Sequence, residues 1–267
     1  MKYIKQISIL IFFGHNAIAQ DHSDNFSARS EEIVIAIGMD SIAAFGMLAK
    51  GKEKKETVIL LHGLPGNERN LDVAQELRRN GRNVIYFNYR GAWGSQGKFL
   101  YANCLEDVRE VLDFFSTPVN SEKYKVKPNS FVLLGHSMGG GIALISGAED
   151  KRVQKIAVYS PWNAGGDPEF SQEAIIGFTM MLESLFMLNI NPHDFIKDLS
   201  DNRSMYSVLN HQDQLNGKSL LILDENRRNE AWISHLDNAE YYVWETDHSF
   251  SDKRLELIEK ISEWIDK

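Results

Sequence analysis

The chemistry of this chain centres on the run Gly135-His136-Ser137-Met138-Gly139, which matches the G-x-S-x-G pattern of a nucleophilic serine. The apolar run 131–134 before it predicts a short buried strand, and 142–145 after it begins a helical pattern. A sharp turn between strand and helix would hold the Ser137 hydroxyl above the sheet edge, with glycines where a side chain would collide. The Met138 N–H, at the start of that helix, could donate to an oxyanion.

A second loop could complete such a site. His62-Gly63-Leu64-Pro65-Gly66 follows the apolar run 57–61, which predicts another buried strand. In open α/β sheets, ligands bind just beyond the carboxyl ends of the strands. The Leu64 N–H is therefore the candidate second oxyanion donor, and His62 reads as a structural loop histidine. The alternative is an ordinary Gly/Pro turn.

A histidine that could act as a base lies near the end of the chain. His248, in Asp247-His248-Ser249-Phe250, follows the last predicted strand at 240–244 and precedes an amphipathic helix. That place would let the imidazole reach the carboxyl edge of the sheet. The alternative is a histidine of a surface loop.

The elements that must position these residues alternate between strand and helix from residue 57 onward. Buried-strand patterns are typical of a parallel sheet with helices on both faces, so the fold class is α/β. Two further strands, at 32–37 and 41–48, are joined by Gly38-Met39-Asp40 and predict an antiparallel hairpin at the sheet edge. Gly-rich residues 89–97 lack a phosphate-binding pattern. Within them we expect Arg90 to anchor the loop and Trp93 to pack beside the site.

The ends and the middle of the chain define its domains. Residues 1–19 resemble a signal peptide, with Lys2 and Lys5, a short apolar stretch, and an A-x-A site before Gln20. The alternative is an uncleaved membrane anchor. Residues 20–267 form one domain, interrupted at about 161–217 by an insertion expected to act as a cap. Its apolar run 174–188 predicts a helix over an apolar pocket rather than a membrane span, because it is short and contains Glu183. Enlarging Gly177 would then change acyl-length preference.

The composition of the chain limits the classes of partner and cofactor that we expect it to bind. The chain has 267 residues and a formal net charge of −8, which makes it a poor binder of nucleic acid. Cys104 is the only cysteine, so no internal disulfide can form. No cluster of Cys, His and acidic residues has the spacing of metal ligands, so no metal and no cofactor is expected. The sequence leaves the oligomeric state open.

Taken together, residues 33–267 resemble the α/β-hydrolase superfamily. The resemblance rests on Gly135-His136-Ser137-Met138-Gly139-Gly140, the loop 62–66, Tyr89-Arg90-Gly91 and Asp247-His248-Ser249-Phe250. It implies an α/β-hydrolase fold with a cap after the sixth strand. It also implies a triad, in which Ser137 attacks a carbonyl, His248 takes its proton, a carboxylate orients His248, and the N–H groups of Leu64 and Met138 hold the oxyanion.

The carboxylate is the point at which the sequence departs from the family pattern. The usual acid positions fall near Arg227 and Arg228, which cannot accept a hydrogen bond. Asp224 is the first choice, since it directly follows the strand 219–223. Glu225 reaches further, but alternation along a strand would point it the other way. Asp167 is third, and Asp247 is expected to point away from His248.

The resulting hypothesis is a secreted or periplasmic serine hydrolase that acts on small or medium carboxylic esters or related acyl compounds. A serine-aminopeptidase-like peptide hydrolase is the near alternative, and an acidic cluster that holds a substrate amine would favour it. A non-catalytic binding protein with the same fold, and a haloperoxidase-like reaction of the same triad, are further alternatives.

Overall fold

A single mixed sheet forms the centre of the molecule. The computed structural model describes residues 26–166 and 171–267, so the predicted signal peptide at 1–19 and the candidate acid Asp167 lie outside the described residues. The sheet has eight strands in the order β1-β2-β4-β3-β5-β6-β7-β8. Their bounds are β1 Arg29–Ile37, β2 Asp40–Leu48, β3 Lys55–Leu61, β4 Asn83–Phe87, β5 Val126–His136, β6 Val153–Tyr159, β7 Ser219–Asp224 and β8 Ala239–Val243.

The pairing of the strands confirms the predicted α/β class. β1 and β2 form the antiparallel hairpin expected at the edge, and β2 also pairs antiparallel with β4. From β4 to β8 every neighbouring pair is parallel. Because parallel strands end at the same edge, the loops after β3, β5, β7 and β8 can meet there.

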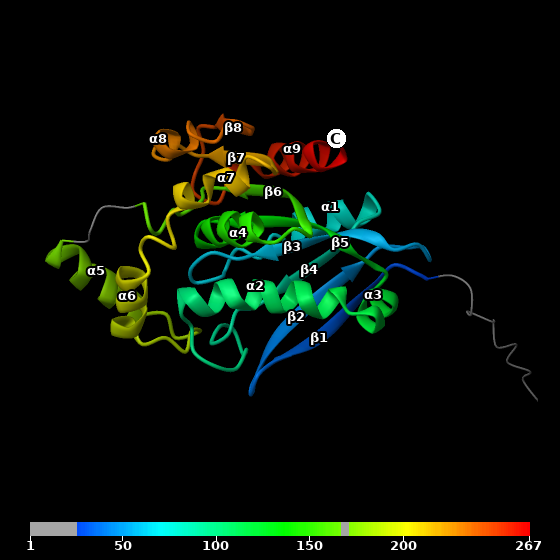
Figure 1. Ribbon diagram of the computed structural model, residues 1–267, viewed down its shortest axis with the longest axis horizontal. Coiled ribbons are helices and arrows are strands. Elements are labelled where there is room, and N and C mark those ends of the chain that lie inside the picture. The colour runs from blue at the N-terminus through cyan, green and yellow to red at the C-terminus, as the bar shows by residue number, and fades with distance from the viewer. Residues whose placement is uncertain (1–25, 167–170) are drawn as a thin grey trace, which may run out of the picture.

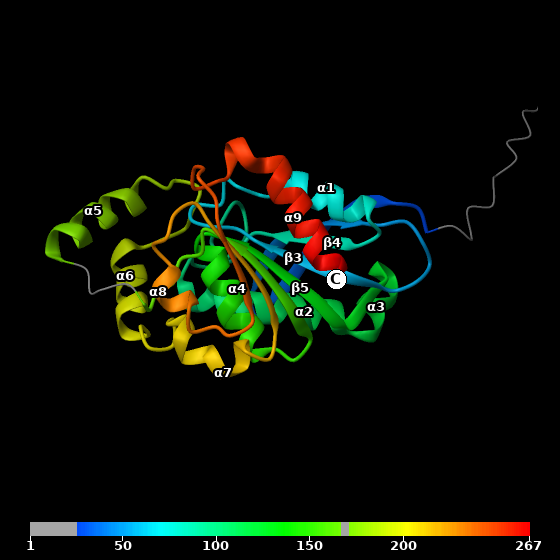
Figure 2. The same cartoon turned by 90° about the horizontal axis from the view of Figure 1, so that it is seen from above.

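Helices cover both faces of this sheet (Figures 1 and 2). In the two views α1 and α9 lie on one face, and α2, α3, α4 and α7 lie on the other. The helices are α1 Leu71–Arg79, α2 Tyr101–Ser116, α3 Pro118–Tyr124, α4 Met138–Glu149, α5 Gln172–Glu183, α6 Pro192–Asp201, α7 Gln212–Leu215, α8 Glu230–Ile233 and α9 Arg254–Asp266, with short 3₁₀ turns η1 Val208–His211 and η2 Ser251–Lys253.

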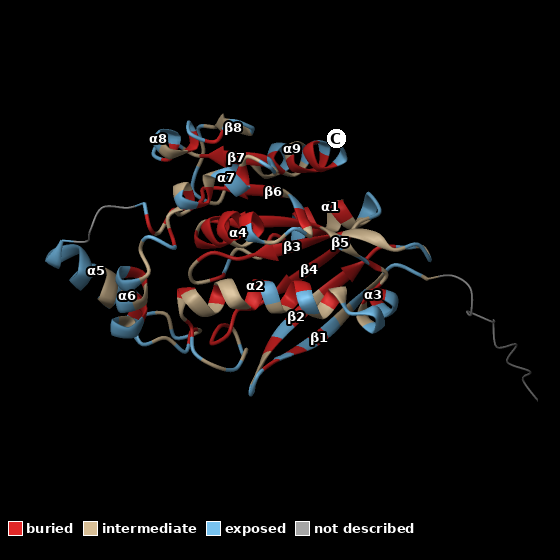
Figure 3. Ribbon diagram, viewed as in Figure 1, coloured by how far each residue is buried: buried red, intermediate tan, exposed pale blue. Residues whose placement is uncertain are grey.

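The two helical layers enclose two hydrophobic cores, one on each face. Alternate residues of a strand point to opposite faces, so Leu220 and Ile222 of β7 join the core beneath α2 and α4. Leu221 and Leu223 join the core beneath α1 and α9. Figure 3 shows the central strands and α4 buried, as expected for a sheet covered on both sides.

The segment between β6 and β7 contains α5, α6, η1 and α7. Figure 1 shows α5 and α6 together at one end of the sheet, opposite α3. The chain after α5 is tied to the loop after β4, since the Trp93 N–H donates to the Met187 carbonyl over 3.0 Å and the Phe99 N–H to the Asn189 carbonyl over 2.9 Å. This segment lies where the insertion at about 161–217 was expected.

Helix α5 differs in two ways from the helix predicted at 174–188. It ends at Glu183, because Ser184 caps it and the chain turns back toward Ala92, which bridges to Leu188. Most of its surface is exposed, and a Cβ added at Gly177 would meet nothing within 4 Å. Gly177 therefore faces open space, and the expectation that enlarging it would reshape an acyl pocket was wrong. In the described ranges, no helix is long and apolar enough to cross a membrane.

The loop after β4 is anchored as the sequence predicted. The Arg90 Nε donates to Asp107 Oδ1 of α2 over 2.5 Å, and its Nη2 pairs with Glu106. Burial raises the pKa of the Asp107 carboxyl to about 6, although its bonds to Arg90 act in the opposite direction. Trp93 in the same loop donates its Nε1–H to the Pro65 carbonyl over 2.8 Å. The anchored loop therefore reaches the loop after β3.

Candidate active site

Ser137 occupies the turn between β5 and α4 in a strained backbone conformation. Its φ is 55° and its ψ is −122°, outside the regions that a residue with a Cβ normally adopts. Main-chain hydrogen bonds hold the turn from both sides. The Ser137 N–H donates to the Tyr159 carbonyl over 3.2 Å, and the Ser137 carbonyl accepts from the Trp162 N–H over 2.9 Å. The predicted strand–turn–helix context is thus present.

The glycines of the motif are required by close backbone contacts. A Cβ at Gly135 would lie 2.3 Å from the Gly139 carbonyl oxygen, and one at Gly139 would lie 2.2 Å from the Leu61 carbonyl oxygen. Both distances are impossible for real atoms, so only glycine lets α4 begin this close to β3 and β5.

The loop 62–66 lies against Ser137. A Cβ at Gly63 would be 2.9 Å from Ser137 Cβ and 3.4 Å from Ser137 Oγ. The Met138 N–H is the first of a helix and has no partner within it. Among the described residues the Leu64 N–H also donates to no group. Two unused donors are therefore available on elements that meet at Ser137.

His62 is buried beside this loop and is not placed to exchange protons. Its Nδ1 lies 2.7 Å from the Gly63 carbonyl oxygen, so Nδ1 carries the hydrogen. Burial lowers the pKa of the imidazole to about 4, with the positive charge of Arg69 acting in the same direction. His62 is thus a neutral structural histidine at neutral pH, as the sequence indicated.

His248 is brought to the site by the residue that precedes the candidate nucleophile. His136 Nε2 lies 3.0 Å from the His248 carbonyl oxygen, and the two imidazole rings are 5.0 Å apart. His136 itself stacks on Tyr159, with ring centroids 4.4 Å apart. Burial lowers the pKa of His136 to about 3, so it stays neutral while it fixes the backbone of His248. No direct hydrogen bond joins the Ser137 and His248 side chains among the described contacts.

The carboxylate next to His248 belongs to Glu225. Its Oε1 lies 3.2 Å from His248 Nδ1, and its Oε2 accepts the Ser160 hydroxyl over 2.6 Å. The Glu225 side chain is only 10% exposed. Burial opposes its ionisation, but the hydrogen bonds from Ser160 and His248 and the charge of Arg228 hold its pKa below the usual value. Glu225 therefore presents a charged, fixed oxygen to the imidazole.

Asp224, the carboxylate preferred from the sequence, does not contact His248. Its oxygens accept hydrogen bonds from Asn229 Nδ2 at 3.0 Å and from the Tyr241 hydroxyl at 3.1 Å. Burial raises its pKa to about 6, despite these two bonds. The physical reason is strand alternation: Asp224 follows Leu223 and points to the α4 face, whereas Glu225 points to the face covered by α9.

Asp247 faces away from the imidazole, as expected. It accepts the N–H groups of Ser249 and Ser251 over 3.0 and 2.8 Å and so closes the turn that carries His248.

The sequence did not single out Ser160 or His136 for the site, and it did not predict that Arg228 would contact Glu225 and His248. Arg228 Nη2 lies 3.3 Å from Glu225 Oε1 and 3.4 Å from His248 Nδ1. His136 had a signal, since it adjoins Ser137 in the motif. Ser160 and Arg228 had none, because their contacts join β6, β7 and the His248 loop only after folding.

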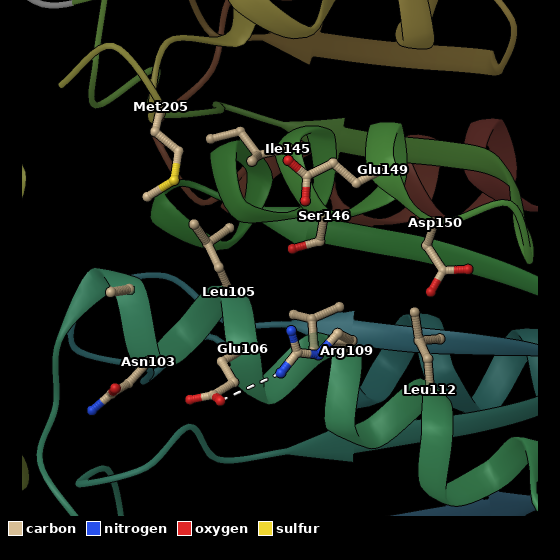
Figure 4. Close-up of a pocket in the computed structure, with 12 residues that line it drawn as sticks. Asn103, Leu105, Glu106, Arg109, Leu112, Ile145, Ser146, Glu149, Asp150 and Met205 are labelled. Carbon is tan, nitrogen blue, oxygen red and sulfur yellow. Dashed lines mark hydrogen bonds and ion pairs between the residues drawn. The ribbon is translucent and has the colours of Figure 1, made fainter. Parts of the chain in front are cut away.

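A large surface cavity lies elsewhere. A cavity of about 530 Å³ is lined by Leu105, Arg109, Ile145 and Glu149 among others. Figure 4 shows these residues projecting from α2 and α4. These α4 residues lie roughly two turns or more beyond Ser137, so the cavity is separate from the cluster around His248. The described residues contain no group of three or more His, Cys, Asp or Glu side chains that could hold a metal ion.

The fold and the strained serine turn define an α/β hydrolase. The profile of the serine aminopeptidase (S33) family matches residues 52–223, and the chain belongs to that family. The matched region contains Ser137 and the loop 62–66 but ends before Glu225, so it says nothing about His248 or its carboxylate.

Individual relatives agree with this class. A probable phospholipase A1, magnifin, of Vespa magnifica is 30% identical over 154 residues, a match that spans 53% of this chain and 45% of that relative. Est1E of Butyrivibrio proteoclasticus has a similar structure, with a TM-score of 0.63, 17% identity, and coverage of 88% of this chain and 99% of that one. An esterase of Pyrococcus furiosus gives a TM-score of 0.64, 16% identity, and coverage of 90% and 91%. At these identities the structural likeness shows the fold alone.

Proposed function

We propose that the protein is a serine hydrolase that cleaves small or medium carboxylic esters through Ser137, His248 and Glu225. The observation on which the proposal chiefly rests is the backbone of Ser137, whose φ of 55° places a non-glycine residue in a strained turn between strand and helix. Strain of this kind is retained where function requires it. The contact of Gly63 with Ser137 and of Glu225 with His248 adds support.

The mechanism that we propose follows the roles of a triad. His248 Nε2 takes the proton of Ser137 Oγ as that oxygen bonds to the ester carbonyl carbon. The N–H groups of Leu64 and Met138 hold the oxyanion. His248 then gives the proton to the departing alcohol, and water repeats the sequence on the acyl-enzyme. Glu225 accepts the Nδ1–H throughout, and so takes the role that the sequence assigned to Asp224. No cofactor or metal has a step in this scheme.

The aminopeptidase reading receives less support. A peptide substrate would bring its ammonium group to the site, and an acidic cluster should hold it. The half-exposed charged side chain beside His248 is instead Arg228, which would repel an ammonium. We therefore favour an ester over an amine-terminated peptide.

The site is tested with a fluorophosphonate probe, which labels an activated serine covalently. We expect labelling of the intact protein and its loss in S137A, with turnover of short-chain 4-nitrophenyl esters lower by several orders of magnitude. H248A should be nearly as damaging, and the double variant little worse than either, because the two residues act as a unit. Labelling that persists in S137A would contradict the assignment, and a folded but unlabelled protein would favour the non-catalytic alternative.

We also propose that the protein is exported to the periplasm or outside the cell. This proposal rests on residues 1–19 as a sequence pattern.

A further inference from the structure

A second charged side chain lies inside the proposed catalytic cluster. Arg228 Nη2 is 3.3 Å from Glu225 Oε1, 3.4 Å from His248 Nδ1 and 3.4 Å from the Ser160 carbonyl oxygen. Its guanidinium thus touches two of the three side chains that we assign to the reaction.

The position of Arg228 creates a conflict of charge. Glu225 Oε1 is shared by His248 Nδ1 and Arg228 Nη2, and both must donate if Glu225 orients the imidazole. The 3.4 Å approach of Nη2 to Nδ1 is then a contact between two donors, not a hydrogen bond. When His248 takes the proton of Ser137, it becomes a cation beside a permanent cation, and like charges repel at this distance. A negative charge bound to Arg228 would relieve that repulsion.

The guanidinium is able to bind such a charge. Arginine has five N–H donors in a planar fork that suits a carboxylate or phosphate. All hydrogen bonds and ion pairs of the Arg228 guanidinium with the described residues use Nη2, which leaves Nε and Nη1 without a described partner. The side chain is 46% exposed, so these donors are accessible from solvent.

The neighbouring arginine shows that exposure alone does not bring a guanidinium to the catalytic cluster. Arg227 is 70% exposed, but it pairs with Glu230 of α8 and contacts neither Glu225 nor His248. Two adjacent residues of the same type thus differ in whether they reach the cluster, which provides a matched control.

We propose that Arg228 recognises a negatively charged group, a carboxylate or phosphate, carried by the ester substrate. This inference rests on the proposed function and names the substrate class of the same site. The anionic group would be held by the spare donors of the guanidinium, and its charge would balance Arg228 when His248 becomes an imidazolium. The charge could lie on the acyl side or on the alcohol side of the ester.

The experiment compares charged and neutral esters of matched size. On the acyl side, the 4-nitrophenyl monoester of succinic acid is compared with 4-nitrophenyl butyrate. On the alcohol side, 3-acetoxybenzoate is compared with phenyl acetate. For each pair, kcat/KM is measured at pH 7.5 and low salt in the wild type, R228Q, R228K and R227Q. The ratio of the two values within a pair is the readout, because it cancels general effects of a substitution on folding or on Glu225.

We expect the wild type to favour the charged ester in at least one pair. R228Q should lower that ratio about fivefold, between the value of an exposed ion pair and that of a charge-assisted hydrogen bond. R228K should lose part of it, since it keeps the charge but not the fork. R227Q should leave the ratio unchanged, and added salt should reduce it in the wild type but not in R228Q.

A ratio that R228Q leaves unchanged in both pairs would overturn the inference. If the protein is labelled by a fluorophosphonate and cleaves the neutral esters, such a result rejects only the role of Arg228. If it is neither labelled nor active on any of the four esters, the proposed function is wrong, and the inference is wrong with it.

Discussion

Two adjacent carboxylates at the end of β7 have opposite surroundings. Glu225 accepts from Ser160 and His248, and its pKa is held below the usual value, whereas burial raises the pKa of Asp224 to about 6. We predict that E225Q lowers kcat by roughly 10⁴-fold, since an unoriented imidazole adopts the wrong tautomer. D224N should retain kcat within a few fold. Steady-state rates on one neutral 4-nitrophenyl ester decide between them, and an equal collapse in D224N would restore Asp224 as the partner of His248.

The raised pKa of Asp224 also predicts how stability depends on pH. The unfolded chain releases this proton near its ordinary value of 3.8 and the folded protein near 6, so between these values the folded state binds more protons. Stability contributed by this group therefore falls as pH rises from about 4 to about 6 and is constant above. Because the side chain is fully buried, the change is on the order of 3 kcal/mol.

The measurement is urea unfolding of the wild type and D224N at pH 4 and pH 7. The free energy of unfolding of D224N relative to that of the wild type should increase from pH 4 to pH 7, since asparagine has no proton to release. D237N, at an exposed position, is the control and should show no comparable change. A constant difference between D224N and the wild type would mean that Asp224 ionises normally.

Site residues that lie within one short motif could be predicted from the sequence. Contacts between residues of distant segments were harder to predict. Ser137 and the loop 62–66 were predicted from short motifs, and the structure brings them into contact. The sequence favoured Asp224 over Glu225 because alternation was applied without knowing the face from which His248 approaches, and in the structure it is Glu225 that contacts His248. The closing helix α9 packs against Leu221 and Leu223, so the residue that shares their face is Glu225.

At the scale of elements, Phe178 of α5 lies near the candidate site. The Phe178 ring lies 6.4 Å from the Trp162 ring, and the Trp162 N–H donates to the Ser137 carbonyl. We predict that F178A shifts the acyl-length preference toward longer chains, because it removes the ring beside Trp162, whose N–H donates to the Ser137 carbonyl. The change is measured as the ratio of kcat/KM for 4-nitrophenyl octanoate and acetate.

Gly177 supplies the control for this prediction. It precedes Phe178 but faces open space, so G177A should leave the acyl preference unchanged. The same substitution should stabilise the protein by up to about 1 kcal/mol, since glycine is unfavourable within a helix. A shift of preference in G177A equal to that in F178A would mean that the whole of α5 responds, not one ring.

The strands were more predictable than the insertion for a physical reason. Buried parallel strands are continuous apolar runs, and β3 and β7 contain the predicted runs 57–61 and 219–223. Helix α5 ends at Glu183, and five residues later Leu188 bridges to Ala92, a contact between segments far apart in the sequence. Helix α6 was not predicted, although Asn191 caps it and Pro192 occupies its first turn, which is a recognisable start signal.

At the scale of the whole molecule, the sequence predicted the class and the edge hairpin, but not the order of strands. That order depends on which way each crossover turns, a property of the packed molecule. One molecular-scale prediction remains for the segment that the structure does not describe. We expect the protein recovered from the periplasm or medium of an expressing bacterium to begin at Gln20, as N-terminal sequencing would reveal. Recovery only in membranes with residue 1 intact would support the anchor alternative.

The burial of Cys104 has a practical consequence for biophysical work. It is the only cysteine in the sequence, it lies on the buried face of α2, and burial raises the pKa of its thiol. Maleimides react with accessible thiolates, so the native protein should react with them only very slowly. A cysteine introduced at the exposed Gly177 would then be the single reactive handle. A fluorophore attached there could report, without any further substitution, whether α5 moves as an ester enters and leaves.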